Sequence, residues 1–404
     1  MDQNDRAITG LVTLAHAMVH TYELSIPIFV TIWLTEFPVT AADLGLLVTV
    51  GMALFGLGAL PGGVLSDRYS SKRLILGCLL GMAVSFVVLG LAPSVAGVAV
   101  ALVLWGAAAS VYHPSGLSLI SNGTTERGRA FAYHGMAGNL GIALGPLVTA
   151  LLLLRFEWRT VALVLAAPAF VAVVVAARAD VDEYAAVEES AADRSADQPT
   201  SIGEFVDASK QLFASAFALV FLVVMCSGLY YRGVLTFLPG LLADLSALRS
   251  VVATYGVDNP ARYLYAGLLM VGVLGQYVGG RLTDVMRPAR GLTVAFAALA
   301  VVALGFVPLA NAGTVPLLLG SALLGFSLFV VQPLYQAAVA ETTPAGTRGI
   351  SYGYTYLGVF GVGALGAAVA GTILTYATPA VLFVVLAGFA ALASATALVL
   401  LFRW

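Results

Sequence analysis

Apolar runs recur along the whole chain and are separated by short polar breaks. About 18 consecutive, mainly apolar residues are enough for an α-helix to cross the hydrocarbon core of a bilayer. Twelve runs reach that length, and the helices that we expect from them cover residues 8–34, 43–64, 74–92, 95–120, 130–154, 160–177, 211–241, 262–282, 291–310, 315–339, 350–375 and 379–402. The pattern predicts an all-α membrane protein whose twelve transmembrane helices form two pseudo-symmetric six-helix halves, 1–178 and 210–404, joined by an acidic linker at 179–209.

Composition supports this prediction and excludes a soluble globule. Hydrophobic residues make up 60% of the chain and charged residues 10%, whereas soluble domains carry about 25% charged residues. Of the Lys and Arg residues outside the apolar runs, fourteen fall on the side of the N-terminus and four on the other side. Because basic residues accumulate in cytoplasmic loops, we expect a multi-pass protein of the cell membrane with both termini in the cytoplasm.

The linker between the halves is strongly acidic, with Arg194 as its one basic residue between positions 179 and 207. Such a segment cannot bury enough apolar surface to fold by itself. We therefore expect a solvated cytoplasmic tether, and a regulatory segment is the alternative.

A stretch from Gly62 to Arg73 is repeated 217 positions later, from Gly279 to Arg290. A second correspondence, at 219 positions, relates Pro114 to Pro333. Self-similarity at about half of the chain length predicts two structural repeats. The prolines free a backbone carbonyl in a membrane helix, so the helices that contain them are either bending elements or simply kinked.

Within the repeated stretch, an aspartate follows a helix end and basic residues follow the aspartate. Such a carboxylate can accept hydrogen bonds from the exposed amides of a neighbouring helix N-terminus. A contact of this kind can break and reform between two states, and the residues expected to form this conformational latch are Gly63, Asp67, Arg68, Arg73, Gly280, Asp284 and Arg290. The alternative is two unrelated basic loops beside membrane helices.

All four histidines of the chain lie in or beside apolar segments of the first half. His16, His20 and Glu23 are spaced i, i+4 and i+7, which confines them to one face of a helix. Placing a carboxylate inside a membrane costs free energy, so Glu23 should face the bundle interior. Imidazole changes charge near neutral pH. Further candidates for a proton-coupling or substrate-binding site are Tyr112, His113 and His134. The alternative is structural hydrogen bonding between helices.

Arg232, next to Tyr231, is the unusual charge of the second half, and Gln332 and Tyr335 are further candidates for substrate binding there. A shift of 209 positions aligns Glu23 with Arg232, so an acidic residue of the first repeat corresponds to a basic residue of the second. Arg232 could bind an anionic substrate, or it could pair with Glu23 and release it when a proton or ligand arrives. A static buried ion pair and snorkelling to the outer interface are the alternatives.

The Gly62–Arg73 stretch resembles the cytoplasmic loop between helices 2 and 3 in the major facilitator superfamily. Ser70 and Ser71 stand where that motif usually has Gly-Arg, and the second copy lacks the arginine after Asp284. The resemblance implies a secondary transporter with twelve transmembrane helices.

The predicted fifth helix carries a packing motif, Gly141, Gly145 and Pro146, in which two glycines four residues apart admit a neighbouring helix. These residues resemble the Gly-Pro motif in the fifth helix of drug-exporting antiporters of the superfamily. Together with the Gly10–His16 and Ser110–Pro114 segments, they resemble the fosmidomycin-resistance type of exporter.

These resemblances imply that two halves rock around a central site and export a small organic solute against proton entry. In such antiporters an arginine usually lies four residues before Gly106, where this chain has Leu102. Proton coupling would therefore depend on another group, and Glu23 is the candidate. The open alternatives are uptake, transport of a metal ion by His16, His20, Glu23 and His113, and a non-transporting membrane sensor.

Other activities find no support in the motifs. Neither lysine follows a glycine, which excludes a phosphate-binding P-loop. The G-x-S-x-G match at Gly349–Gly353 opens an apolar helix in the half that contains no histidine, which is not the context of a hydrolase nucleophile. We expect a transporter rather than an enzyme, with no cofactor, no resident metal and no nucleic-acid partner. The expected partners are a small-molecule substrate, protons and the lipid bilayer, and we expect a monomer.

Overall fold

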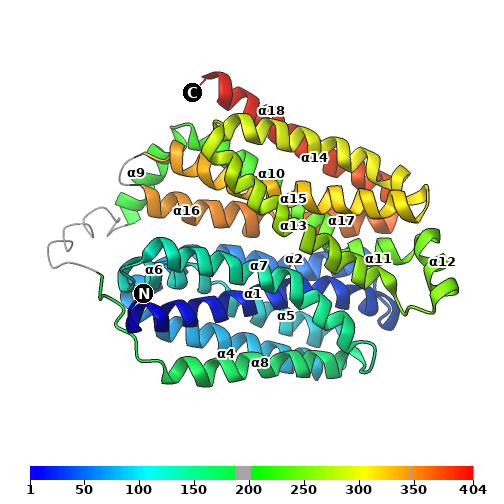
Figure 1. Cartoon of the computed structure of the whole chain (residues 1–404), viewed down its shortest axis with the longest axis horizontal. Coiled ribbons are helices and arrows are strands. Elements are labelled where there is room, and N and C mark those ends of the chain that lie inside the picture. Colours follow the sequence, from blue (N-terminus) through cyan, green and yellow to red (C-terminus); the bar gives the residue numbers. More distant parts are fainter. Residues whose placement is uncertain (187–201, 345–346, 404) are drawn as a thin grey trace. The chain divides into compact units, whose positions relative to one another are not determined.

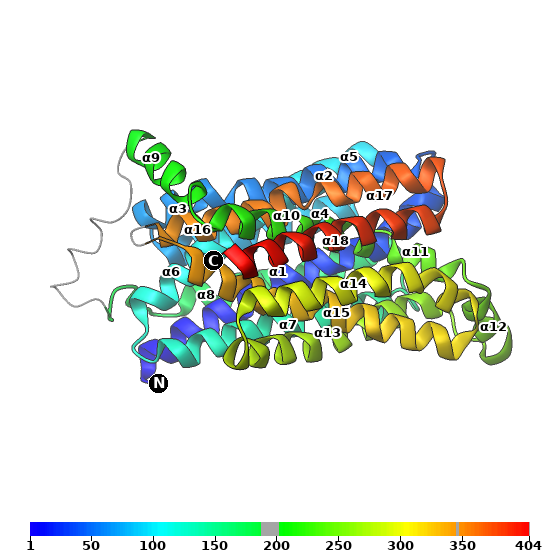
Figure 2. The ribbon, with the colours of Figure 1, turned by 90° about the horizontal axis from the view of Figure 1, so that it is seen from above.

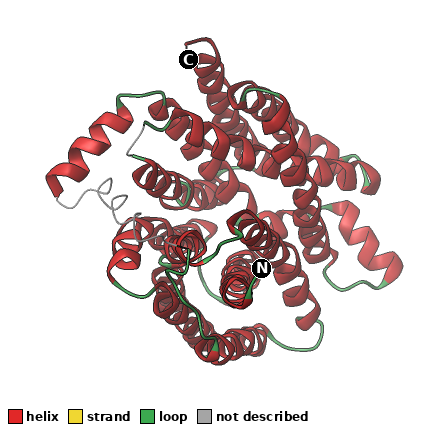
Figure 3. Cartoon of the chain, turned by 60° about the vertical axis from the view of Figure 1, so that its left-hand side comes forward, coloured by secondary structure: helices red, strands yellow, loops and turns green. Residues whose placement is uncertain are grey.

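The computed structural model describes residues 1–186, 202–344 and 347–403, and every regular element in these ranges is a helix (Figure 3). Twelve helical spans of the described residues are long and apolar enough to cross a membrane. The all-α, twelve-helix prediction is confirmed. The elements are α1 (Gln3–Glu36), α2 (Ala41–Leu57), α3 (Ala59–Arg68), α4 (Ser71–Gly90), α5 (Val95–Ala109), α6 (Tyr112–Gly123), α7 (Arg127–Leu152), α8 (Trp158–Arg178), α9 (Ile202–Phe213), α10 (Phe217–Leu235), α11 (Leu238–Ala243), α12 (Ser246–Tyr255), α13 (Pro260–Val285), α14 (Pro288–Asn311), α15 (Thr314–Thr342), α16 (Arg348–Tyr356), the π-helical turn η2 (Leu357–Val362), α17 (Leu365–Tyr376) and α18 (Pro379–Arg403).

The chain divides into two compact units, of which the first comprises Met1–Ile32 and Val50–Ala196 and the second comprises Trp33–Thr49 and Asp197–Trp404. In the first unit α4 packs along α5 and α8. In the second unit α13 packs along α15, and α14 packs along α18 (Figures 1 and 2). Each unit is thus a bundle of helices.

The start of α2 belongs to the second unit because it packs on α17. Thr49 donates a hydrogen bond from Oγ1 to the carbonyl oxygen of Ala364 at 2.9 Å. A Cβ atom on Gly45 would meet the backbone of Ala367, which shows that the two helices approach at backbone distance. The predicted half at 1–178 therefore differs from the compact unit at this segment.

The two repeats make the same helix contact in their own units. In the first unit, a Cβ on Gly62 would lie 3.3 Å from Cγ of Pro114 and 3.3 Å from Cα of Val111. In the second unit, a Cβ on Gly279 would lie 3.2 Å from Cδ of Pro333 and would meet the carbonyl of Val330. Gly62 corresponds to Gly279, and the two Val-Pro pairs correspond to each other, so the sequence repeat is also a repeat of packing.

A second pair of contacts follows the same rule. A Cβ on Gly106 would overlap the carbonyl oxygen of Gly51, and a Cβ on Gly325 would overlap the carbonyl oxygen of Leu268. Gly106 in α5 and Gly325 in α15 are separated by 219 positions, the spacing that also relates Pro114 to Pro333. Glycine at these positions lets helix backbones touch, and dispersion between closely packed helices stabilises membrane bundles.

Four predicted helices are not continuous. The 43–64 helix breaks at Gly58, and the 95–120 helix breaks at Ser110 and Val111. The two breaks are in contact, because a Cβ on Gly58 would overlap the Ser110 side chain. The 350–375 helix contains the π-helical turn η2, and the 211–241 helix divides into α10 and α11. Two further helices, α9 in the predicted linker and α12, were not predicted, since both are too short and polar for the membrane criterion.

We predict opposite effects of Gly→Ala substitution at two helix positions. Gly106→Ala forces a methyl group into the Gly51 backbone and should destabilise the fold by about 1–3 kcal/mol. Gly77→Ala enters open space and should be neutral or stabilising by about 0.5–1 kcal/mol. Thermal unfolding of the detergent-solubilised variants measures both, and equal unfolding temperatures would contradict the close contact.

Candidate functional site

Helix α1 places His16, His20 and Glu23 on one face, as their spacing predicted. All three side chains are buried, and the Glu23 residue is only 1% exposed. An ionisable group in a membrane-spanning helix is stable only when partners hold it. The hydrogen bonds of these residues therefore decide what the site can do.

The three side chains form a continuous hydrogen-bonded chain, which we call the Glu23–His20–His16 chain. Oε2 of Glu23 lies 2.5 Å from Nδ1 of His20. Nε2 of His20 lies 3.0 Å from Nε2 of His16, and Nδ1 of His16 lies 2.7 Å from the carbonyl oxygen of His134. A carbonyl oxygen only accepts, so Nδ1 of His16 carries the hydrogen and Nε2 of a neutral His16 ring only accepts.

This arrangement fixes the number of protons. When His16 is neutral, Nε2 of His20 donates to it, because the His16 nitrogen that it faces is then an acceptor. Either His20 is an imidazolium that also donates to an ionised Glu23, or a protonated Glu23 donates to Nδ1 of a neutral His20. In both cases the Glu23–His20–His16 chain holds one proton more than it would with an ionised Glu23 and two neutral imidazoles.

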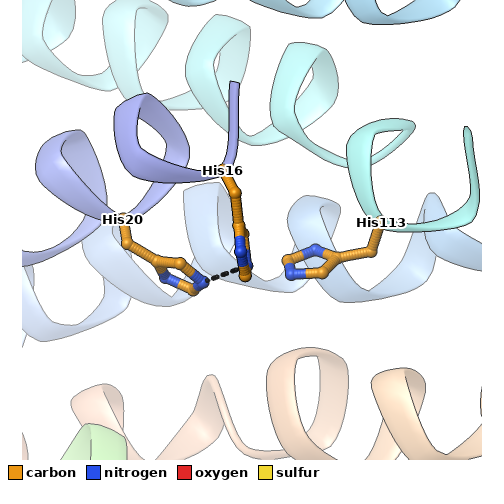
Figure 4. A group of neighbouring side chains, drawn as sticks. All are labelled: His16, His20 and His113. Carbon is orange, nitrogen blue, oxygen red and sulfur yellow. Dashed lines mark hydrogen bonds between the residues drawn. The ribbon is translucent and has the colours of Figure 1, made fainter. Parts of the chain in front are cut away.

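A second helix brings Tyr112 and His113 to the same place. The break at the end of α5 lets α6 begin at Tyr112, so both residues lie in its first turn. The Tyr112 hydroxyl donates to the carbonyl oxygen of Val12 at 2.5 Å. The His113 ring lies 5.3 Å from the His16 ring and 5.8 Å from the His20 ring, and it faces the pair in Figure 4.

The fourth histidine, His134 on α7, stacks on His16 with ring centroids 3.8 Å apart. Its Nε2 is buried and has no hydrogen-bond partner among the described residues.

Glycines of α7 make room for this site. A Cβ on Gly138 would lie 2.5 Å from Cε1 of His16, and Gly141 and Gly145 lie against the α1 backbone at Ala17 and Thr21. The sequence predicted close packing at Gly141 and Gly145, with Pro146 buried beside them. It did not indicate that Gly138 leaves space for an imidazole, since no spacing rule relates positions on different helices.

In the second unit, α10 buries Arg232, which is 2% exposed. Its guanidinium carbon lies 5.4 Å from the centroid of the Tyr231 ring and 5.9 Å from that of Phe360. Aromatic faces stabilise a cation at such distances, and Phe360 lies in η2, a π-helical turn of the kind found at functional sites. This burial disagrees with snorkelling to the outer interface.

The remaining candidates of the second half lie on α15. Gln332 accepts a hydrogen bond from Nε2 of Gln276 at 2.7 Å, and Tyr335 is buried. Gln276 and Phe360 were missed as site candidates. A glutamine inside an apolar run was a detectable signal, but the position of Phe360 depends on the π-helical turn.

Comparison with known proteins identifies the family. The model of the Major Facilitator Superfamily matches residues 11–367, which is most of the chain.

This chain belongs to the major facilitator superfamily. It is a membrane transporter rather than an enzyme. Among curated proteins, the puromycin resistance protein pur8 of Streptomyces alboniger is 30% identical over 132 residues, a match that spans 30% of this chain and 26% of that protein.

Solved transporters share the fold over the whole chain. A bacterial homologue of the human lysosomal transporter Spinster, inward-facing and occupied, has a TM-score of 0.73 at 16% identity and covers 100% of this chain and 98% of its own. The nucleoside transporter NupG has a TM-score of 0.76 at 13% identity, with coverages of 99% and 100%. At this identity the likeness shows the superfamily fold alone.

The loop that carries the superfamily motif has an unexpected partner in the first unit. Glu183, just after α8, accepts hydrogen bonds from the backbone amides of Ser71 at 2.7 Å and Lys72 at 3.2 Å and from the Ser70 hydroxyl. A carboxylate at this position satisfies the first amides of α4 and interacts favourably with the helix dipole. Glu183 therefore caps α4.

The start of the linker, residues 179–186, forms hydrogen bonds with several helix ends. Lys72 donates from Nζ to the carbonyl oxygen of Ala179 at 2.5 Å. The Asn4 side chain exchanges two hydrogen bonds with the Asp182 backbone, at 2.8 and 3.0 Å. The rest of the acidic segment, 187–201, lies outside the described residues.

The latch stays a prediction. The side chain of Asp67 lies outside the described part of the structure. The charged side chains Arg68, Arg73, Asp284 and Arg290 are exposed, and a Cβ on Gly63 or Gly280 would have no heavy atom within 4 Å.

Removal of the Glu183 charge should weaken the first unit. Glu183→Gln keeps the size of the side chain but replaces a charged acceptor with a neutral amide, so we expect a loss of about 0.5–2 kcal/mol. Asp180→Asn, an exposed carboxylate three residues away, is the matched control. Thermal unfolding in detergent measures the difference, and identical curves for the two variants would exclude a stabilising cap.

Proposed function

We propose that this chain exports a small organic, anionic solute in exchange for protons, by alternating access across the cell membrane with both termini in the cytoplasm. The observation that carries the proposal is the Glu23–His20–His16 chain. It holds one proton between three buried groups, and removal of that proton leaves two acceptors facing each other, either Glu23 and His20 or His20 and His16. We expect proton release to reorient these side chains, and the hydrogen bond of His16 to the carbonyl oxygen of His134 would carry the change to α7.

Other groups around the chain tune this step. His113 on α6 and His134 on α7 are the further titratable side chains in ring contact with His16, and Tyr112 stacks at 5.5 Å. Three imidazoles around one proton disfavour a second positive charge. The site is thus suited to carry a single proton per cycle.

The buried Arg232 supports an anionic solute. A guanidinium is always charged and offers five donors in a planar fork, which matches carboxylate and phosphate groups. Tyr231 and Phe360 line its surroundings, and such rings bind the apolar part of an organic molecule. Gln332 and Tyr335 are proposed as further substrate contacts.

The direction of transport is supported by similarity. The relative from Streptomyces alboniger is named a puromycin resistance protein, and export of a compound is one way to resist it. The resemblance of Gly141, Gly145 and Pro146 on α7 to the Gly-Pro motif of drug-exporting antiporters favours the same direction. The repeated Gly62–Arg73 stretch would act as the latch between the two states.

We predict that Glu23→Gln abolishes proton-driven transport but leaves downhill exchange of solute. The amide still forms a hydrogen bond with His20, but it cannot release a proton. Reconstituted vesicles with an imposed pH gradient, screened with small organic anions and puromycin, measure solute and proton movement together.

Glu36→Gln is the matched control, because it changes an exposed carboxylate at the end of the same helix. Solute flux that is indifferent to the gradient in the unaltered protein would contradict proton coupling and leave the carrier intact. Gradient-driven accumulation in the opposite direction would replace export with uptake.

We predict that Arg232→Gln leaves the fold intact and abolishes transport, since the neutral amide cannot replace a charged fork. Arg249→Gln on α12, an exposed arginine, should retain activity. Monodisperse elution in size-exclusion chromatography checks folding, and vesicle flux checks function. Unchanged flux in Arg232→Gln would remove this residue from the mechanism.

A further inference from the structure

We infer that His16, His20 and His113 form a binding site for a divalent transition-metal ion such as Zn²⁺. The inference goes beyond the proposed function and does not depend on it. One ligand nitrogen from each of the three rings can be chosen so that all three lie within 4.8 Å of one another, and all three residues are buried. Figure 4 shows His16 and His20 on α1 and His113 on α6 turned toward one another.

The first argument is the distance between the two α1 histidines. Their Nε2 atoms are 3.0 Å apart. In a tetrahedral zinc site with Zn–N bonds of about 2.0–2.1 Å, two ligand nitrogens lie about 3.3–3.4 Å apart. An opening of a few tenths of an ångström therefore converts the hydrogen-bonded pair into two metal ligands. Histidines at i and i+4 on one helix face are a recurrent zinc-binding pair.

The second argument is the orientation of the rings. Metal-binding histidines usually donate their other ring N–H to a carboxylate or a backbone carbonyl, which fixes the tautomer. Nδ1 of His20 lies 2.5 Å from Glu23, and Nδ1 of His16 lies 2.7 Å from the carbonyl oxygen of His134. Both outer positions are thus occupied by acceptors of the right type, and both Nε2 atoms are directed to the shared space.

The third argument is the position of His113. It approaches from α6, in the first turn after the break that follows α5. One nitrogen of its ring lies within 4.8 Å of a nitrogen of each α1 histidine, so a short approach brings three ligands to tetrahedral spacing. Imidazole nitrogens suit Zn²⁺, Co²⁺, Ni²⁺ and Cu²⁺ better than Mg²⁺ or Ca²⁺, and Glu23 offsets part of the charge. A bound ion would join α1 to α6 and leave a fourth position open.

The test uses Co²⁺ as a spectroscopic probe on the full-length chain in detergent. The chain contains only four histidines, so any polyhistidine tag must first be removed. We expect one Co²⁺ per chain with the visible absorption of a tetrahedral site, displaced by Zn²⁺ and reversed by a chelator. This measurement needs neither transport nor a variant.

Variants then assign the ligands. His20→Gln and His113→Gln should lose the Co²⁺ spectrum, and Glu23→Gln should weaken binding about 10–100-fold. Asp244→Asn, an exposed carboxylate of the second unit, is the control and should retain the spectrum. Size-exclusion profiles show that each variant is folded.

The outcomes are distinct. No Co²⁺ binding by the unaltered protein, or binding that survives both His20→Gln and His113→Gln, overturns the inference. Metal binding without proton-coupled flux would support the metal site and reject the proposed function, and the reverse result would do the opposite.

Discussion

The interaction on which the proposed function depends is the hydrogen bond between two imidazole nitrogens of a membrane-spanning helix. Nε2 of His20 faces Nε2 of His16 at 3.0 Å, while their Nδ1 atoms face Glu23 and a backbone carbonyl. A neutral His20 can donate from Nε2 to His16, but its Nδ1 is then an acceptor that faces Glu23, so one additional proton completes both contacts. Water cannot take its place cheaply at such burial. This geometry supports the proposed proton site.

The bundle keeps this site in place through contacts of backbone with backbone. Gly138 leaves space for His16, and Gly141 and Gly145 hold α7 against α1. Gly106 holds α5 against α2 at Gly51. In a bilayer the apolar effect does not drive helices together, so close packing of small residues carries much of the association. Small residues around the histidines thus serve stability and function together.

The two repeats share packing but differ in chemistry. Gly62 with Pro114 and Gly279 with Pro333 form equivalent contacts in their own units. The first repeat is broken between α5 and α6, just before His113, whereas α15 of the second repeat is continuous through Pro333. The first repeat carries the histidines and Glu23, and the second carries Arg232 among aromatic rings. The two repeats therefore share a packing frame and differ in their ionisable groups.

The sequence by itself determined the membrane class, the twelve helices, the internal repeat and the shared face of His16, His20 and Glu23. These features depend on local composition and helical periodicity, which are properties of neighbouring positions. Only the tertiary structure decided that Gly138 makes room for His16, that the break after α5 turns His113 toward α1, and that Glu183 caps α4. These contacts join residues more than 90 positions apart, and no periodicity along one helix specifies which residue of another helix it meets.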